Sequence, residues 1–291
     1  MQHAVWQLRG SSITLDQPIV MGILNVTPDS FSDGGKQATI GAAVRAGVTM
    51  VRDGAALVDV GGESTRPGAA PIPVAEELAR VIPVVERLVG EGVVVSIDTS
   101  KPEVARRGIK AGAAVINDVT GLAAPEMRDI CAQAGVGVVI MHMQGTPETM
   151  QTDPEYHDVV AEICSYLSER ATTARDAGIG RDSIVVDPGI GFGKTLAHNI
   201  EILRHLDAFT PLGYPVLVGT SRKGFLGAIL EPIRGATRPD ERDGATVATV
   251  ALSVASGVQI VRVHNVPLAV EVAYTANAMV PAEHDKEIDR T

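Results

Sequence analysis

The sequence predicts a single (β/α)8 barrel, a TIM barrel of the α/β class, with an N-terminal β-hairpin. Three observations lead to this prediction: short apolar runs recur eight times, segments with helical spacing separate them, and almost every run is followed directly by a polar residue. The runs are mostly continuous rather than alternating, which is typical of parallel strands buried on both faces. The length of 291 residues suits one large barrel as well as two smaller domains.

The hairpin is expected within residues 1–18, with Gly10-Ser-Ser12 between two short strands, where it would close the amino-terminal end of the barrel. The barrel is expected to span residues 19–280, and the charged segment 281–291 is expected to form a flexible tail. The expected barrel strands are Ile19–Leu24, Ala56–Val60, Val93–Ile97, Ala113–Ile116, Gly137–Met141, Ile184–Val186, Val216–Val218 and Gln259–Val263. A doubly wound sheet is the alternative, but it rarely needs eight evenly spaced units, and no G-x-G-x-x-G follows the first strand.

Helical spacing is clearest at Val74–Val89, Pro102–Ala111, Val159–Asp176 and Asp243–Ser256. The segment Ser100-Lys-Pro-Glu103 predicts a helix start with Ser at the cap and Pro in the first turn. Cys131 and Cys164 lie in helix-like segments, and we expect both to be free thiols in a reducing compartment.

The composition narrows the classes of function. A net charge of −10 argues against a broad surface for nucleic acid or anionic lipid. The segment MQHAVWQLRGSS lacks the layout of a secretory signal, and no apolar run approaches the ~20 residues of a membrane helix. We therefore expect a cytoplasmic protein without nucleic-acid or membrane partners.

The segment DPGIGFGKT, residues 187–195, resembles a phosphate-binding P-loop at first sight. A P-loop has four residues between its first glycine and Gly-Lys, whereas only three separate Gly189 from Gly193, and Asp187 would repel a triphosphate. We instead expect Asp187 to end the sixth barrel strand, Phe192 to form an apolar wall, and Lys194 to stay at the surface.

In such a barrel the functional site lies at the carboxyl ends of the strands. Asp98, Asn117 and Asp187 stand there, and two carboxylates with an amide suit a flat heterocycle rich in N–H donors. Lys223 adds a donor for a carbonyl or a ring nitrogen. The alternative for each residue alone is that it caps a loop or a helix.

Basic residues form a second group at the predicted rim. This group is Arg66, Arg222, Arg262 and His264, and several such residues on one rim indicate a phosphate or diphosphate site. Ion pairing or loop anchoring is the alternative for each one singly. Asn25 is a candidate ligand for a hydrated Mg²⁺ that also holds phosphate oxygens, since such sites use few protein ligands.

Eight motifs in order resemble those of dihydropteroate synthases, a family of pterin-binding barrels. They are MGILNVTPDSFSDGG (21–35), DVGGESTRPG (59–68), SIDTSK (96–101), IND (116–118), MHMQ (141–144), DPGIGF (187–192), TSRK (220–223) and RVH (262–264), within a resemblance that runs from about residue 13 to 280. Two departures are visible, Gly224 where many members carry Ser and Asn265 where many carry Asp.

The resemblance implies that 6-hydroxymethyl-7,8-dihydropterin diphosphate loses pyrophosphate and that the amine of para-aminobenzoate attacks the freed carbon, giving 7,8-dihydropteroate for folate biosynthesis. It implies catalytic roles for Asp98, Lys223, Asp33 and Arg66. It places Asp98, Asn117, Asp187, Lys223, Met141 and Gly219 at the pterin, Asn25 with Mg²⁺, Arg262 and His264 at the diphosphate, and Thr65, Arg66, Pro67, Phe192, Ser221 and Phe31 at the aminobenzoate. A homodimer through outer helices and inhibition by sulfonamides are also implied. For Asp33 a turn-forming role is the alternative, and for His142 a structural role is expected.

The implied chemistry agrees with the charges. Cleavage leaves a positive carbon on the pterin and a strongly negative leaving group, so carboxylates should lie near the first and cations near the second. An aromatic amine is neutral at pH 7 and needs no base, which agrees with a sequence without a Ser–His–Asp arrangement. Three alternatives stay open: a methyltetrahydrofolate–corrinoid methyltransferase, a Schiff-base aldolase using Lys223, and a non-catalytic pterin-binding protein.

Overall fold

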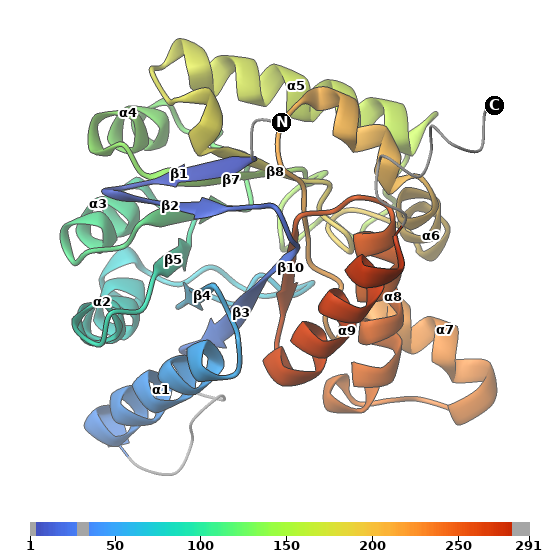
Figure 1. The fold of residues 1–291 in the computed structure, drawn as a ribbon, viewed down its shortest axis with the longest axis horizontal. Coiled ribbons are helices and arrows are strands. Elements are labelled where there is room, and N and C mark those ends of the chain that lie inside the picture. Colours follow the sequence, from blue (N-terminus) through green and yellow to red (C-terminus); the bar gives the residue numbers. More distant parts are fainter. Residues whose placement is uncertain (1–3, 28–34, 281–291) are drawn as a thin grey trace.

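The computed structural model describes residues 4–27 and 35–280, in which eight parallel strands are surrounded by helices (Figure 1). The strands are hydrogen-bonded in the order β8-β7-β6-β5-β4-β3-β10-β9, and a parallel bridge between Val186 and Val216 joins the two ends of the sheet. The predicted (β/α)8 barrel with an N-terminal hairpin is therefore confirmed.

All eight apolar runs form barrel strands. The strands are β3 (Ile19–Asn25), β4 (Leu57–Gly61), β5 (Val95–Asp98), β6 (Val115–Asp118), β7 (Gly137–Met141), β8 (Ile184–Asp187), β9 (Leu217–Val218) and β10 (Ile260–Val263). The helices are α1 (Gly35–Arg52), α2 (Val74–Gly90), α3 (Pro102–Lys110), α4 (Pro125–Ala134), α5 (Val159–Asp176), α6 (Leu196–Arg204), α7 (Gly224–Arg234), α8 (Asp243–Ala255) and α9 (Val266–Met279).

One predicted helix start is wrong in detail. Lys101, rather than Ser100, occupies the cap position of α3, and it makes no side-chain cap hydrogen bond there. The physical reason is that the Lys101 ammonium group is bound to Glu63 and Glu77 on the neighbouring β4–α2 segment. Pro102 is the first residue of the helix, as its fixed φ favours.

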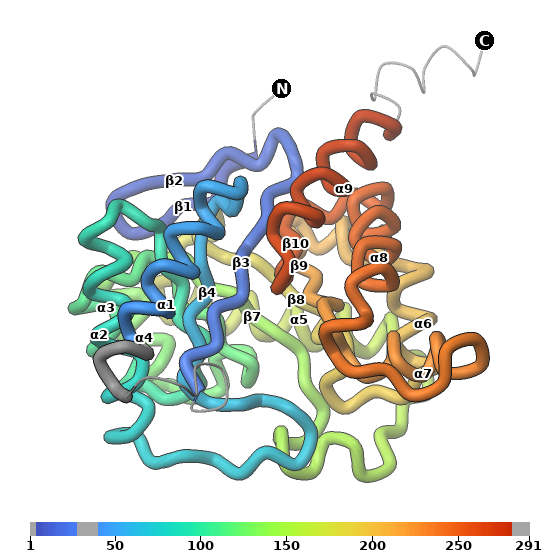
Figure 2. Tube along the Cα trace, turned by 90° about the horizontal axis from the view of Figure 1, so that it is seen from below, coloured from blue at the N-terminus to red at the C-terminus, as the bar shows by residue number. Residues whose placement is uncertain are grey.

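The N-terminal hairpin closes one end of the barrel. Its strands are β1 (Val5–Leu8) and β2 (Ser11–Thr14), and Gly10 between them has a left-handed φ of 72°. Trp6 is fully buried, and its Nε1 donates a hydrogen bond of 3.1 Å to the carbonyl oxygen of Ser183. Ser11 and Ser12 thus belong to β2 rather than to the turn. Figure 2 shows the hairpin at one end and the long loops after β4 and β7 at the other.

The inside of the barrel changes from apolar to polar along its axis. Alternate residues of a strand face the same side. The inward residues near the hairpin form one apolar cluster with Trp6 and Leu8, namely Met21, Leu57, Val115, Val139, Val185, Leu217 and Ile260. Two positions further along six of these strands stand Asp59, Asn117, Met141, Asp187, Gly219 and Arg262. The polar layer is therefore held on rigid strands above a packed core.

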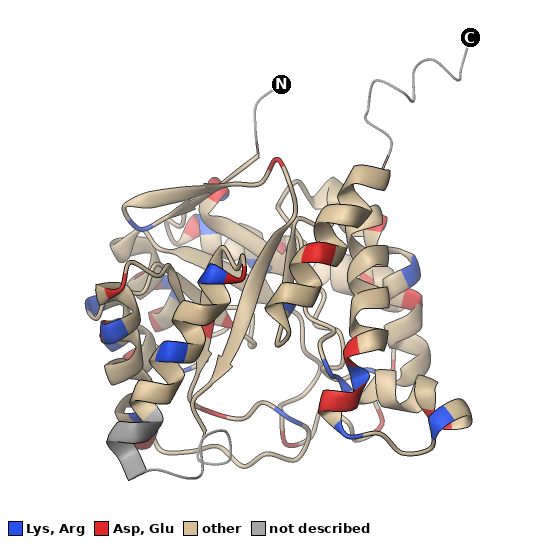
Figure 3. Cartoon of the chain, turned by 60° about the horizontal axis from the view of Figure 1, so that its bottom comes forward, with Lys and Arg blue, Asp and Glu red and all other residues tan. Residues whose placement is uncertain are grey.

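The remaining strand faces pack against the helices in a second, larger core. Figure 3 shows charged residues of both signs on the outer helices and in the loops away from the hairpin. Across residues 4–27 and 35–280, none of the helices has the length and apolar character to cross a bilayer. Cys131 and Cys164, both in the described part of the chain, are free thiols, as predicted.

Candidate active site

The predicted site residues on the strands meet at the carboxyl end of the barrel. Adjacent strands place them side by side in register: Asn25 opposite Gly61, Gly61 opposite Asp98, and Asp98 opposite Asn117. Met141 likewise lies opposite Asp187. The next strands contribute Gly219 and Arg262, which face each other, since a Cβ on Gly219 would lie 3.7 Å from the Cβ of Arg262.

Arg262 lies directly against the acidic group. Its Nε donates to Asp59 Oδ2 at 2.6 Å, and its Nη2 donates to Asp98 Oδ2 at 2.8 Å. Asn117 Nδ2 donates to the same Asp59 oxygen at 2.9 Å. Of the predicted basic group, Arg262 is therefore in direct contact with the predicted acidic residue Asp98.

Asp59 is a site residue that the sequence analysis missed. Its side chain is fully buried, and it binds both Arg262 and Asn117 through Oδ2, while its Oδ1 has no hydrogen-bond partner among the described residues. The barrel pattern points to residues at strand ends, whereas Asp59 stands in the middle of β4. The signal was nevertheless present, because a lone carboxylate inside the apolar run Leu57-Val-Asp-Val60 requires a buried partner.

Burial shifts the pKa values of three groups in this layer. Burial raises the pKa of Asp98 to about 7, although Arg262 opposes the shift. Burial also raises the pKa of Asp187, while Lys223 and the backbone N–H of Gly189 oppose this. Lys223 has its pKa lowered to about 8 by burial, against the attraction of Asp187. Asp98, Asp187 and Lys223 thus lie in a poorly hydrated environment.

The loop after β8 carries several of these contacts. Asp187 Oδ1 accepts the backbone N–H of Gly189 at 2.7 Å. Gly189 has a φ of 68°, and a Cβ there would lie 1.9 Å from the carbonyl oxygen of His142, so this position requires glycine. Lys223 Nζ donates to the carbonyl oxygen of Ile190 and lies 4.4 Å from the centre of the Phe192 ring. The loop therefore brings Phe192 next to Lys223.

The expectation that Lys194 stays at the surface is wrong. Lys194 is only 2% exposed, and its Nζ lies 3.0 Å from His142 Nδ1 and donates to the Phe192 carbonyl at 2.9 Å. The reason is that the loop folds back across the end of β7 and carries the side chain inward. Burial, followed by the charge of Lys194, lowers the pKa of His142 to about 3, so this ring is neutral at pH 7. The His142 ring also packs edge-on against the Tyr166 ring, with 4.8 Å between the ring centres, which agrees with the expected structural role.

Ser221 and His264 form a pair at the ends of β9 and β10. Ser221 Oγ lies 2.9 Å from His264 Nδ1 and accepts the backbone N–H of His264 at 3.1 Å. Burial, with Arg262 and Arg222 nearby, lowers the pKa of His264 to about 3. Arg222 itself binds Asp243 through Nε and Nη2 at 2.8 and 2.9 Å, so its guanidinium group is occupied.

The loop at residues 62–73 carries Thr65, Arg66 and Pro67, and it is anchored at its base. Lys101 Nζ donates to Glu63 Oε1 at 2.8 Å, to the fully buried Glu77 at 2.7 Å, and to the Ile72 carbonyl at 2.8 Å. Arg66 is exposed. The predicted residues Phe31 and Asp33 lie outside the described residues.

The donor set near Asn25 fits a magnesium ion held mainly by a substrate. A Cβ on Gly61 would lie 3.7 Å from Asn25 Oδ1 and 3.9 Å from Asp98 Oδ2, so both oxygens lie beside the same position of β4, and Asp98 Oδ2 also accepts from Arg262. Within the part of the chain that the structure describes, no group of three or more His, Cys, Asp or Glu side chains converges as a metal site. One amide and one carboxylate suit Mg²⁺, which retains water and binds phosphate oxygens.

Comparison with known proteins identifies the family. Residues 21–264 match the model of the pterin binding enzyme family. The dihydropteroate synthase of Escherichia coli K12 is 45% identical over 97% of this chain and 98% of its own length. Dihydropteroate synthase from Xanthomonas albilineans, solved with 4-aminobenzoic acid, matches with a TM-score of 0.88 and 46% identity, covering 96% of this chain and 100% of that one. The Yersinia pestis enzyme, solved as a sulfonamide drug complex, matches with a TM-score of 0.87 and 42% identity over 94% of this chain and 98% of that one. A polar layer at the carboxyl end of a (β/α)8 barrel and similarity to these enzymes over nearly the full chain lead to one conclusion: the chain belongs to the dihydropteroate synthase family of pterin-binding enzymes.

Proposed function

We propose that the dihydropteroate synthase activity of this chain divides the barrel mouth between a pterin subsite, a diphosphate subsite and an aminobenzoate subsite. The reaction condenses 6-hydroxymethyl-7,8-dihydropterin diphosphate with para-aminobenzoate and releases pyrophosphate and 7,8-dihydropteroate. The observation that carries the proposal is the contact of Arg262 with both Asp98 and Asp59. It supports a site in which cation and carboxylates reach the two sides of one breaking bond.

The pterin subsite is assigned to the polar layer of the strands. Asp98, Asn117 and Asp187 offer acceptors and an amide to the N–H-rich edge of the ring, and Lys223 offers a donor to its carbonyl or ring nitrogen. Met141 offers an apolar surface to the flat face of the pterin ring, and Gly219 has no side chain to obstruct it. The partial desolvation that raises the pKa of Asp98 and Asp187 favours this assignment, because N–H donors of a ligand would compensate the buried carboxyl groups.

The diphosphate subsite is assigned to Asn25, Arg262 and His264. A guanidinium group recognises phosphate oxygens with paired donors, and a neutral imidazole donates one further hydrogen bond. Asn25 would hold Mg²⁺ together with the phosphate oxygens. The ion would supply positive charge for the phosphate oxygens when bound. The residues of the chain itself hold the leaving group against the wall and keep water from the carbon.

The aminobenzoate subsite is assigned to the loops above the layer. Phe192 next to Lys223 supplies an apolar wall, while Ser221 and the loop residues Thr65, Arg66 and Pro67 border it. Phe31 and Asp33, beyond the described residues, complete the proposed set, with Asp33 facing the reacting carbon. Because the aromatic amine is neutral at pH 7, it attacks without a general base.

The same proposal extends to the setting of the enzyme. We assign it to the cytoplasm and to a homodimer through outer helices. Large apolar side chains on these helices are exposed in the single chain, namely Ile229, Ile233, Leu252, Tyr274 and Met279. Their position on α7, α8 and α9 supports an interface between two copies there. Competition of a sulfonamide with aminobenzoate is expected, since the drug resembles that substrate.

The test is pyrophosphate release on mixing the pterin diphosphate, para-aminobenzoate and Mg²⁺ with the purified chain. Asp187→Ala should weaken binding of the pterin by about 1–3 kcal/mol, because ring donors would lose their acceptor in a partly dry pocket. His264→Ala should weaken the binding of pyrophosphate far more than the binding of a bare pterin. In calorimetric titrations, an unchanged pterin affinity of Asp187→Ala would refute the first role. An equal loss of affinity for both ligands in His264→Ala would refute the second.

A further inference from the structure

Arg222 stands in a backbone conformation that its side chain disfavours. Its φ is 61°, in the left-handed region that glycine occupies at little cost. The two neighbours of Arg222 are Ser221, which binds His264, and Lys223, whose ammonium group lies beside Phe192. A strained residue thus sets the direction in which two site residues leave the end of β9.

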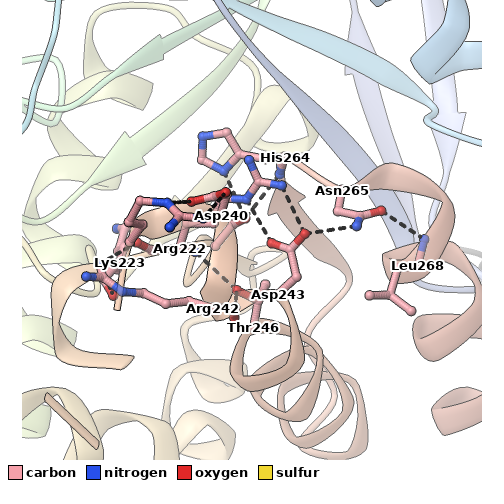
Figure 4. A network of polar contacts seen from close by, with 11 residues as sticks. Arg222, Lys223, Asp240, Arg242, Asp243, Thr246, His264, Asn265 and Leu268 are labelled. Atoms are coloured by element: carbon pink, nitrogen blue, oxygen red, sulfur yellow. Dashed lines mark hydrogen bonds and ion pairs between the residues drawn. The ribbon is translucent and has the colours of Figure 1, made fainter. Parts of the chain in front are cut away.

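Three residues at the N-terminal end of α8, one of them its cap residue Arg242, bind the backbone and the side chain of Arg222. Figure 4 shows this network. The Arg222 backbone N–H donates to Thr246 Oγ1 at 3.1 Å, and its carbonyl oxygen accepts from Arg242 Nη1 at 3.1 Å. Its guanidinium group binds both oxygens of Asp243 at 2.8 and 2.9 Å. We call Arg242, Asp243 and Thr246 the Arg222 clamp.

The clamp is itself fixed by its surroundings. Asn265 Nδ2 donates to Asp243 Oδ2 at 2.9 Å, and Asn265 Oδ1 accepts from Leu268 N at 3.4 Å as the cap of α9. Arg242 crosses α7 where Gly227 stands, because a Cβ on Gly227 would lie 2.9 Å from the guanidinium group. The clamp therefore connects the turn after β9 to three helices.

From this geometry we infer that the Arg222 clamp positions Ser221 and Lys223 for substrate, and that Arg222 is a positioning residue rather than an anion ligand. The inference rests on the proposed function, since it assigns the clamp to the pterin and aminobenzoate subsites. Two features support it. The guanidinium group of Arg222 binds both oxygens of Asp243, a residue outside the proposed substrate subsites, whereas Asp98, one partner of Arg262, lies within them. Both backbone polar groups of the strained residue are also bound by the same short segment.

The decisive comparison is between Arg222→Ala and Arg222→Gly. Both variants remove the guanidinium group, but only alanine retains the Cβ that makes this φ costly. We expect Arg222→Ala to lower kcat/KM for the pterin diphosphate by about tenfold, equivalent to about 1.4 kcal/mol. We expect Arg222→Gly to stay within about threefold of the unmodified enzyme, since glycine adopts this turn without strain.

Asp243→Ala tests the clamp from the opposite side. Alone it should lower kcat/KM about as much as Arg222→Ala. In the Arg222→Gly background its further effect should be limited to the loss of the Asn265 hydrogen bond, because the ion pair with Arg222 is already absent. Glu103→Ala, which removes an exposed partner of Arg106, is the matched control for the loss of a surface carboxylate. The thermal unfolding midpoint of each variant shows whether a loss of activity comes from unfolding or from displacement of Ser221 and Lys223 in a folded chain.

If Arg222→Ala and Arg222→Gly lower kcat/KM equally and Asp243→Ala leaves kcat/KM unchanged, the inference is overturned in favour of direct anion binding by Arg222. Amide hydrogen exchange of residues 217–224, measured without ligand, should be faster in Arg222→Ala and Asp243→Ala than in the unmodified chain. Unchanged exchange would also overturn it. Exchange depends on no catalytic activity, so the clamp is tested even if the unmodified enzyme releases no pyrophosphate, an outcome that would refute the proposed function instead.

Discussion

The pH dependence of the reaction should follow from two buried groups that lie in one layer. Burial raises the pKa of Asp98 to about 7 and lowers the pKa of Lys223 to about 8. If the pterin is bound by ionised Asp98 and protonated Lys223, activity is lost as pH falls through the first value and as pH rises through the second. The profile of kcat/KM, which reports the free enzyme, should therefore be bell-shaped.

The magnitude follows from the two pKa values. With values of about 7 and about 8, the fraction of enzyme in the required form is about 60% at pH 7.5, about 9% at pH 6 and about 3% at pH 9.5. Activity should therefore fall about sevenfold on the acid side and about twentyfold on the alkaline side. Because the two groups interact, each limb belongs to the pair, and the assignment of the limbs requires variants.

The assay is the initial rate of pyrophosphate release at low pterin diphosphate and saturating aminobenzoate, at constant ionic strength. Asp98→Asn cannot titrate, so its residual activity should lose the acid limb. Lys223→Arg should move the alkaline limb beyond the measured range, since a guanidinium group stays protonated throughout that range. A flat profile between pH 6 and 9 would show that these carboxyl and ammonium groups do not govern binding. An acid limb that survives in Asp98→Asn would refute its assignment to Asp98 and point to Asp187, whose pKa burial also raises.

Two further predictions concern residues that touch no substrate in the proposed site. Asp59→Leu removes the acceptor shared by Arg262 and Asn117, and it should lower the free energy of unfolding in urea by about 3–5 kcal/mol because a buried guanidinium group loses a partner. A change below about 1 kcal/mol would contradict this. Lys101→Met frees the loop of residues 62–73, so KM for aminobenzoate should rise about tenfold, with pterin affinity changed less than about twofold. Lys110→Met is the exposed control, and equal effects on both ligands would argue against a loop-specific role.

The fold was predictable because it depends on local pattern. Eight apolar runs with polar ends specify parallel strands, and α5 begins and ends where its spacing predicts. The strand-end residues were also predictable as a set, because barrel topology brings all carboxyl ends together.

Contacts between distant segments were not predictable. The Lys194 ammonium group turns inward to His142, which is 52 residues away, and the Arg222 guanidinium group binds a carboxylate 21 residues further along the chain. Sequence spacing carries no information on such distances once a loop has folded back. Asp59 differs, because its apolar neighbours already imply that it is buried. It lies in the middle of β4 and not at a strand end, where the barrel pattern predicts site residues.

The N-terminal hairpin that carries Trp6 also determines from which end substrates can reach the barrel. Because the Trp6 indole and packed aliphatic side chains close that end, we expect substrates to reach the proposed site from the opposite end, where the loops after β4 and β7 lie (Figure 2). Access to the site should therefore depend on those loops and not on the hairpin.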